Sequence, residues 1–205
     1  MSLNFANNNS LSAIDTKPSG LSGGALTLLS TQTASSSASI SFTSGIDSTY
    51  KEYQFHYTDI HPANDDAYFQ FNMSADSGSN YNVAKTSTFF RAFHTQTGGT
   101  SALGYLTDDD LAQGTGFQRL IEYGYNDATS SSSGILYLFD PSSTTFVKHF
   151  TAQTTYRRSY SSESHASAVI HVGGYGNTTS AIDAVQFKFA SGNIDAGTIK
   201  MYGVS

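Results

Sequence analysis

Apolar and polar side chains alternate along several short segments of this sequence, and this period of two limits the fold more than any other feature. Successive side chains of an extended strand point to opposite faces, so alternation places one face in a core and the other in water. Aromatic and β-branched residues, which suit such pleated and half-buried surfaces, occupy the apolar positions. The clearest examples are residues 40–42, 53–57, 69–73 and 185–189.

Residues that favour turns separate the alternating segments. Gly, Asn, Asp and Ser favour turns because Gly tolerates positive φ and the polar side chains bond to nearby backbone. Such clusters lie at 44–45, 76–80, 98–99, 130–134, 173–174 and 191–193. About ten short strands joined by turns predict an all-β fold, an antiparallel β-sandwich of jelly-roll-like arrangement.

Residues 108–122 are the one stretch whose spacing also fits a helix. The three aspartates at 108–110 can cap a helix N-terminus, whereas Gly114 and Gly116 disfavour a helix interior. We therefore expect one helical turn at most, followed by a strand at 117–124.

Residues 1–24 differ from the rest of the chain because they are rich in Asn, Ser and Gly and hold few side chains that could support a core. Such segments are common at domain ends. At roughly 100–200 residues per domain, the chain is expected to be one domain with an arm. We predict a flexible arm over residues 1–24 that anchors the protein in an assembly, and a sandwich domain over residues 25–205.

Composition excludes several classes of protein. The net charge of −6 disfavours nucleic-acid binding, which needs clustered Lys and Arg. There is no cysteine, hence no disulfide scaffold or thiolate site. The sequence contains no run of ~18 apolar residues, so we expect no membrane-spanning helix. The first residues lack the pattern of a secretory signal. Ser and Thr number 32 and 23 of 205 residues, so the predicted surface is coated with hydroxyl groups.

Residues that could carry catalysis or bind metal are dispersed. The six histidines show no metal-ligand spacing, and alternation places His56 on the water side of its strand. The aspartates gather in turn-rich loops, where Asp commonly caps backbone groups, and residues 76–80 are more typical of a hairpin loop than of a calcium loop. We predict no catalytic residue, no cofactor and no metal. Only the loop aspartates support the alternative of a glycosidase, which needs two carboxylates across a cleft.

Two segments, residues 86–93 and 143–150, share a pattern of hydroxyl residues followed by Phe, a basic residue and Phe. If both are strands, each carries these three side chains on one face. The two sets are Phe89, Arg91 and Phe93, and Phe146, Lys148 and Phe150.

Tyrosines near predicted loops and strand ends are the best candidates for ligand or partner contacts. Exposed aromatic rings beside Asn, Asp and Ser serve saccharide binding and protein interfaces, because a ring offers apolar area at low entropic cost. The alternative is that these rings merely shield strand edges. The candidate contact residues are Tyr81, Tyr105, Tyr125, Tyr156 and Tyr160, together with Asp108 and Asp109.

Several longer strings resemble virion proteins of marine tailed bacteriophages, a group of tail-associated or head-decoration proteins of the cyanophage and pelagiphage kind. The resemblance runs from about residue 25 to the end and consists of turn and strand signatures rather than catalytic motifs. The strings that carry it are residues 45–53, 60–66, 74–81, 138–146 and 182–203.

The resemblance implies a non-catalytic structural protein of the virion, either a tail-fibre or receptor-binding part or a capsid decoration. Its partners would be other virion proteins and further copies of itself, with a trimer favoured for a fibre-like part. The alternative function is a carbohydrate-binding module that recognises host surface glycans. The two are compatible when the host receptor is a glycan.

Overall fold

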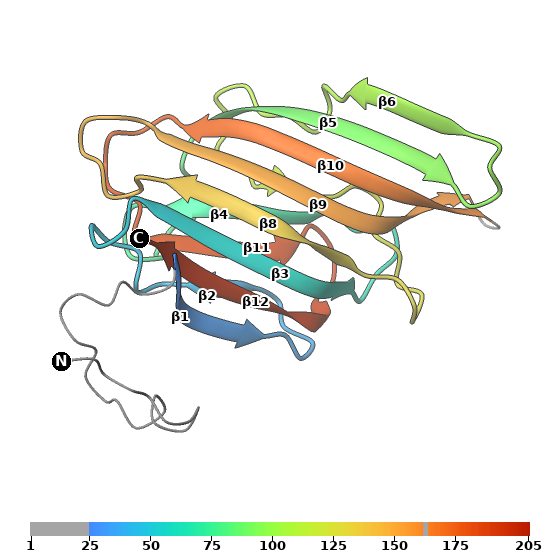
Figure 1. The fold of residues 1–205 in the computed structure, drawn as a ribbon, viewed down its shortest axis with the longest axis horizontal. Coiled ribbons are helices and arrows are strands. Elements are labelled where there is room, and N and C mark those ends of the chain that lie inside the picture. The colour runs from blue at the N-terminus through green and yellow to red at the C-terminus, as the bar shows by residue number, and fades with distance from the viewer. Residues whose placement is uncertain (1–24, 162–163) are drawn as a thin grey trace, which may run out of the picture.

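The computed structural model describes residues 25–161 and 164–205, so the predicted arm at residues 1–24 lies outside the described residues. The described residues form strands, turns and loops and contain no helix. Figure 1 shows the strands: β1 (Leu26–Thr33), β2 (Ile40–Phe42), β3 (Glu52–Pro62), β4 (Phe69–Ser74), β5 (Lys85–Thr95), β6 (Ser101–Tyr105), β7 (Gln118–Arg119), β8 (Ser132–Phe139), β9 (Lys148–Ser161), β10 (Ser164–Gly176), β11 (Ala184–Phe189) and β12 (Ile194–Val204).

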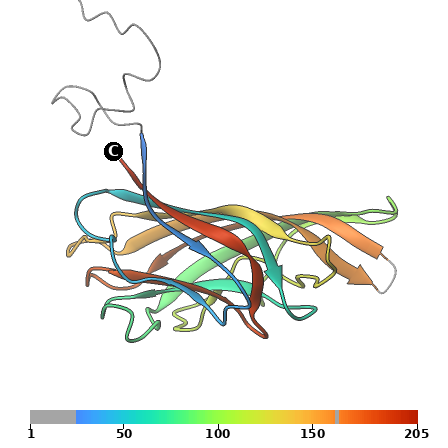
Figure 2. The same cartoon turned by 90° about the horizontal axis from the view of Figure 1, so that it is seen from below.

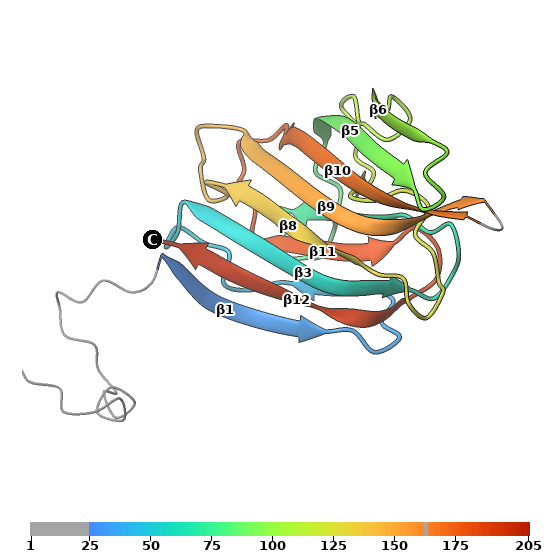
Figure 3. The same cartoon turned by 45° about the vertical axis from the view of Figure 1, so that its right-hand side comes forward.

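The strands form two layered sheets, which confirms the predicted antiparallel β-sandwich (Figure 2). The larger sheet has the order β1-β12-β3-β8-β9-β10-β5-β6, and its strands lie side by side in Figure 3. The smaller sheet has the order β2-β11-β4-β7. Every neighbouring pair is antiparallel. The smaller sheet covers one face of the larger sheet, which we call the inner face; the opposite face is the outer face.

Aromatic rings from both sheets fill the core. Phe187 of β11 lies at its centre, with ring centroids 5.6 Å from Phe55 and 6.4 Å from Tyr57 on the larger sheet. Phe69 of the smaller sheet stacks on it at 5.8 Å. These rings are the apolar half of the alternating segments, so the period of two has the physical basis expected from the sequence.

Two glycines from clusters predicted as turns lie inside strands instead. Gly174 lies near the C-terminal end of β10, and Gly134 is in β8. A Cβ on Gly134 would lie 2.2 Å from the Gln153 carbonyl oxygen and 2.8 Å from the Tyr57 ring. A Cβ on Gly174 would lie 2.7 Å from the Phe150 ring. The prediction was wrong because these glycines make room for core rings rather than for a turn.

Three further expectations need correction. The absence of a helix from residues 108–122 agrees with the expectation of one helical turn at most, but only Gln118–Arg119 of the strand expected at 117–124 is a strand. The loop at 76–80 is a turn, but it joins β4 and β5, which belong to different sheets, so it is not a hairpin loop. Phe146 precedes β9 and is 69 % exposed, so it does not share a face with Lys148 and Phe150.

Candidate functional site

The outer face of the larger sheet carries an extended polar surface. Along β9, Ala152, Thr154 and Tyr156 are buried, whereas Gln153 and Thr155 between them are exposed. The same alternation in β8 and β10 gives the outer face a set of hydroxyl, amide and imidazole groups. His56 on β3 also lies on this face, half-buried, and burial lowers its pKa.

Two adjoining hollows form a groove on this face, which we call the outer-face groove. The broader hollow, of about 540 Å³, spans β8, β9, β10 and β5. The narrower one, of about 270 Å³, lies over β8 and β9 alone, and both hollows include Ser133 and Thr155 in their lining. From Ser131 to Tyr137 the groove follows six residue steps of extended chain, about 20 Å. The side chains that define it are Ser131, Ser133, Ile135, Tyr137, Gln153, Thr155, Arg157, His165, Ser167, His94 and Gln96.

Two residue pairs across β8 and β9 make the floor of the groove, and the side chains of the first pair are short. Ser133 pairs with Thr155 across β8 and β9, and Ile135 pairs with Gln153. Between them Gly134 leaves space for the Tyr57 ring from the inner face, and the Tyr57 hydroxyl lies 2.5 Å from the Thr154 hydroxyl. The floor is therefore supported from below by a buried ring, while hydroxyl groups face the solvent.

The broad end of the groove is organised around Arg157. Its Nη1 donates to the hydroxyl groups of Thr129 at 2.5 Å and Ser130 at 3.3 Å, and lies 3.5 Å from the Asp127 carboxylate. Hydrogen bonds from Thr129, and more weakly the charge of Arg157, lower the pKa of Asp127, so this carboxylate is ionised at neutral pH. The guanidinium is thus fixed by the loop that precedes β8 and has its charge offset locally.

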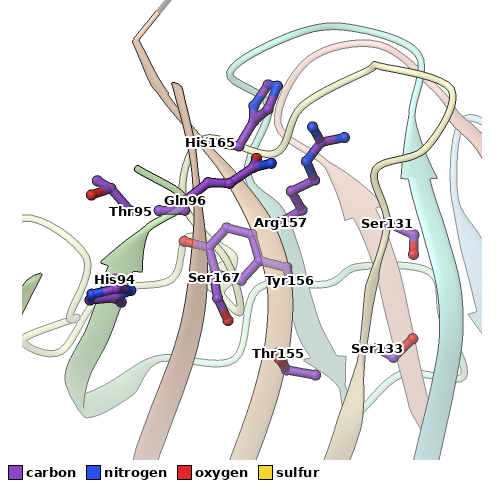
Figure 4. Close-up of a pocket in the computed structure, with 11 residues that line it drawn as sticks. His94, Thr95, Gln96, Ser131, Ser133, Thr155, Tyr156, Arg157, His165 and Ser167 are labelled. Atoms are coloured by element: carbon purple, nitrogen blue, oxygen red, sulfur yellow. The ribbon is translucent and has the colours of Figure 1, made fainter. Parts of the chain in front are cut away.

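His165 lies at the same end. Figure 4 shows its ring near the guanidinium of Arg157 and the amide of Gln96, with Ser133 and Thr155 farther along the groove. Its ring packs 4.8 Å from that of Tyr125, and its buried Nδ1 has no hydrogen-bond partner within residues 25–161 and 164–205. The ring as a whole is half-buried and lines the hollow, so the imidazole can contact a ligand there.

The narrow end presents aromatic surface. Tyr137 lines the hollow, and the ring of Phe139 stacks on it with a centroid distance of 6.4 Å and an interplanar angle of 8°. Phe139 is 36 % exposed. Parallel rings beside a polar floor are the surface on which the apolar face of a sugar ring packs.

A third hollow, of about 610 Å³, lies beyond the loop that holds Arg157 and is lined by Asp59, His61 and Asp195 among others. Its polar groups already bond to one another or to the backbone. His61 Nδ1 lies 3.7 Å from the Asp195 carboxylate, and its Nε2 lies 3.2 Å from the Asp127 carbonyl oxygen. We therefore place the candidate site in the outer-face groove.

Arg91 and Arg158 on the inner face form a buried ionic cluster with Glu122. Arg91 is hydrogen-bonded to Glu122, and Nε of Arg158 lies 3.8 Å from the same carboxylate. Burial raises the pKa of Glu122, and the hydrogen bond from Arg91 opposes this effect. The cluster lies beneath the sheet and does not line the groove, so its role is structural.

The predicted contact residues do not gather in one place. Tyr125 borders the groove through His165, whereas Tyr105 on β6 and the exposed Asp108 lie near the far edge of the sheet, and Tyr81 is half-buried in the loop before β5. Tyr160 lies in β9, and its side chain is outside the described residues.

Two of these residues were expected to be exposed and are not. Tyr156 is 5 % exposed because it points from β9 into the core, where its hydroxyl accepts a hydrogen bond from the Glu122 backbone at 3.4 Å. Asp109 is also buried, since its carboxylate accepts from Arg119. Position near a loop did not distinguish a core ring from a surface ring.

The sequence reasoning missed most of the groove, including Ser133, Thr155, Arg157 and Tyr137. Alternation places Thr155 and Arg157 on a solvent face, but nothing in the sequence separates this hydroxyl-rich stretch from many others. Among the described residues, no group of three or more His, Asp or Glu side chains is placed to hold a metal ion. The same residues include no helix long and apolar enough to cross a membrane.

Comparisons of the chain with protein-family models, with curated proteins and with solved structures find no match. We therefore infer function from the geometry of the outer-face groove and from the sequence features described above.

Proposed function

We propose that this protein is a non-catalytic structural module that binds a saccharide in its outer-face groove. The observation that carries the proposal is the groove itself, about 20 Å long, with hydroxyl and amide groups along its floor and stacked rings at one end. Hydroxyl and amide groups exchange hydrogen bonds with sugar hydroxyls, and aromatic rings pack against the apolar faces of sugars.

The groove supports binding rather than hydrolysis. A glycosidase needs two carboxyl groups about 5–9.5 Å apart on either side of the scissile bond. No Asp or Glu of the described residues lines either hollow of the groove. The carboxylate of Asp127 is held by Thr129 and Arg157 outside the groove lining.

The resemblance to virion proteins of marine tailed phages supports placing this module on a phage particle, on the tail or as a capsid decoration. Residues 1–24 would attach it to other virion proteins, and copies of the chain would assemble with one another, with a trimer favoured. The module would then present its groove to a glycan of the host surface.

Immunogold electron microscopy of the particles, together with a chain that lacks residues 1–24, tests the location. We expect label on intact particles and none after the deletion, with the shortened protein still folded. Light scattering of the full chain tests the trimer. Unlabelled particles, or normal incorporation of the shortened chain, would contradict the proposed location or anchor.

A glycan array tests the saccharide-binding function, with Thr155→Arg as the variant that fills the groove. Thr155 is exposed, so the substitution is compatible with folding. The matched control is Thr88→Arg, which adds the same charge to an exposed outer-face position on β5 outside the groove lining. We expect the wild type and the control to bind the same glycans and Thr155→Arg to lose them. Equal glycan binding by all three proteins would rule out the groove as the saccharide-binding site.

A further inference from the structure

We infer that the outer-face groove selects an unbranched, uncharged saccharide chain of several units that lies parallel to β8 and β9. This inference rests on the proposed saccharide-binding function and adds the class of ligand. It follows from the shape of the groove, from the distribution of charge along it and from the chemistry of its two ends.

The shape favours a chain over a single sugar. The two hollows share Ser133 and Thr155, so they form one elongated space rather than two separate pockets. Its length from Ser131 to Tyr137 is about 20 Å, set by six residue steps of β-strand. A space of this length is filled only by a ligand that is itself extended.

The narrow half favours an unbranched segment. All residues that line it come from β8 and β9, and neighbouring strands are about 4.8 Å apart. The floor between Ile135 and Gln153 is thus two strands wide. Sugar rings in single file fit above such a floor, whereas a side branch would have to extend over β3 or β10.

The charge distribution favours an uncharged ligand. Among the described residues, Arg157 is the only one with a permanently charged side chain in the lining of the two hollows. Its Nη1 already lies 3.5 Å from the ionised Asp127 and donates to Thr129, so little positive charge is left for a ligand. The net charge of −6 on the whole chain further disfavours a polyanion. The other polar groups of the groove, such as Gln153, are neutral donors and acceptors.

The two ends differ in chemistry, which gives the bound chain a direction. Tyr137 and Phe139 offer stacked ring surface at the narrow end. At the broad end, the half-buried imidazole of His165 and the side chain of Gln96 line the hollow and lie near each other in Figure 4. One sugar ring packs on the aromatic pair, while hydroxyl groups of a distant unit bond to the imidazole and amide.

Isothermal titration calorimetry with defined oligosaccharides tests the inference on the full chain. The probes are neutral linear gluco-, manno-, galacto- and xylo-oligosaccharides of one to eight units, oligogalacturonides of the same lengths, and a branched galactomannan oligosaccharide. We expect one neutral linear series to bind with affinity that rises with length and levels off once the groove is filled. We expect the affinity for this series to change less than about twofold between low and high salt, since an uncharged ligand forms no ion pair that salt could screen.

Tyr137→Ala tests the aromatic end. Loss of a stacked ring is expected to weaken the longest oligosaccharide about tenfold and to leave shorter ones, bound at the broad end, less affected. The matched control is Tyr202→Ala, which removes an outer-face tyrosine on β12 that packs on His56 outside the groove. The control is expected to bind as the wild type does, and circular dichroism checks the fold of both variants.

Each contrary result has a distinct meaning. Tighter, salt-sensitive binding of oligogalacturonides would overturn the uncharged ligand, and affinity independent of length would overturn the extended chain. Preference for the branched oligosaccharide would overturn the single-file arrangement. In all three cases saccharide binding itself would stand. No binding of any saccharide by the folded protein would overturn the proposed function and this inference together.

Discussion

Lys85 Nζ donates a hydrogen bond to the side-chain oxygen of Asn72 at 2.6 Å, and this contact links the two sheets. Lys85 opens β5 of the larger sheet, Asn72 lies in β4 of the smaller sheet, and both side chains are fully buried. The ammonium group also donates to the Val83 carbonyl at 2.7 Å. Its two acceptors are uncharged, and burial lowers the pKa of Lys85 to about 7.

The first prediction is that Asn72→Ala destabilises the fold. The substitution removes an acceptor from Lys85 and leaves three backbone carbonyls, those of Tyr81, Thr115 and Gly116, without their side-chain donor. Leaving buried polar groups unpaired costs about 1–3 kcal/mol for each important contact. We expect urea unfolding to show a loss of about 3 kcal/mol. A loss below about 0.5 kcal/mol, typical of surface substitutions, would contradict this account.

The second prediction concerns pH. The pKa of Lys85 is lower in the folded chain than in the unfolded chain, so above pH 7 the unfolded state binds more protons and stability rises with pH. By pH 9 the gain over pH 7 is on the order of 2 kcal/mol. Above pH 10 the trend reverses, because burial raises the pKa of Tyr57 and Tyr156 and the unfolded state loses their protons first.

Urea unfolding between pH 6 and about pH 11 measures both the rise and the reversal. Lys85→Met has no titrating group at this position and serves as the comparison. We expect its stability to vary little from pH 7 to pH 9. If the wild type and Lys85→Met have parallel profiles over this range, the buried amine is not the source of the pH dependence.

The third prediction distinguishes a glycine whose missing Cβ makes room for neighbouring core atoms from a glycine with open space around it. In Gly134→Ala the new Cβ would lie 2.2 Å from a backbone oxygen, which a side-chain rotation cannot relieve. We expect a loss of at least about 2 kcal/mol, in the upper range for overpacked cores. The matched control is Gly104→Ala in β6, where a Cβ meets nothing within 4 Å. Thermal melting of both variants provides the measurement, and equal melting temperatures would refute the role assigned to Gly134.

The same glycine shows how far the sequence predicts this structure. Alternation around Phe55 and Phe187 identified β3 and β11 because one face of each is buried against the other sheet. Gly134 was assigned to a turn because its role depends on the Tyr57 ring, 77 residues away and on a neighbouring strand. Local sequence specifies which face is apolar, whereas a close approach between strands depends on their register.

The groove was beyond prediction for a related reason. Ser133 and Thr155 look like any other hydroxyl residues in a chain that holds 32 Ser and 23 Thr. Their significance comes from pairing opposite each other between larger neighbours, which requires the register of β8 and β9. Tyr156 shows the converse error, since a ring that looked like a surface contact points into the core.

The fourth prediction concerns the buried cluster of Glu122, Arg91 and Arg158. Glu122→Ala removes the carboxylate that both guanidinium groups approach and leaves positive charge beneath the sheet. Removing one partner of a buried ion pair lowers the free energy of unfolding by about 3–5 kcal/mol, because the remaining charge is no longer compensated. We expect a loss of this size in urea unfolding.

Lys51→Met provides the comparison, because the ion pair of Lys51 with Asp140 is exposed to solvent, with Nζ 2.9 Å from the carboxylate. Exposed pairs contribute about 0–1 kcal/mol, since water and salt screen them. The difference between the two variants should persist in 0.5 M NaCl, because salt screens the exposed pair and hardly reaches the buried one. If Glu122→Ala costs no more than Lys51→Met, the cluster of Glu122, Arg91 and Arg158 does not stabilise the fold as a buried ion pair.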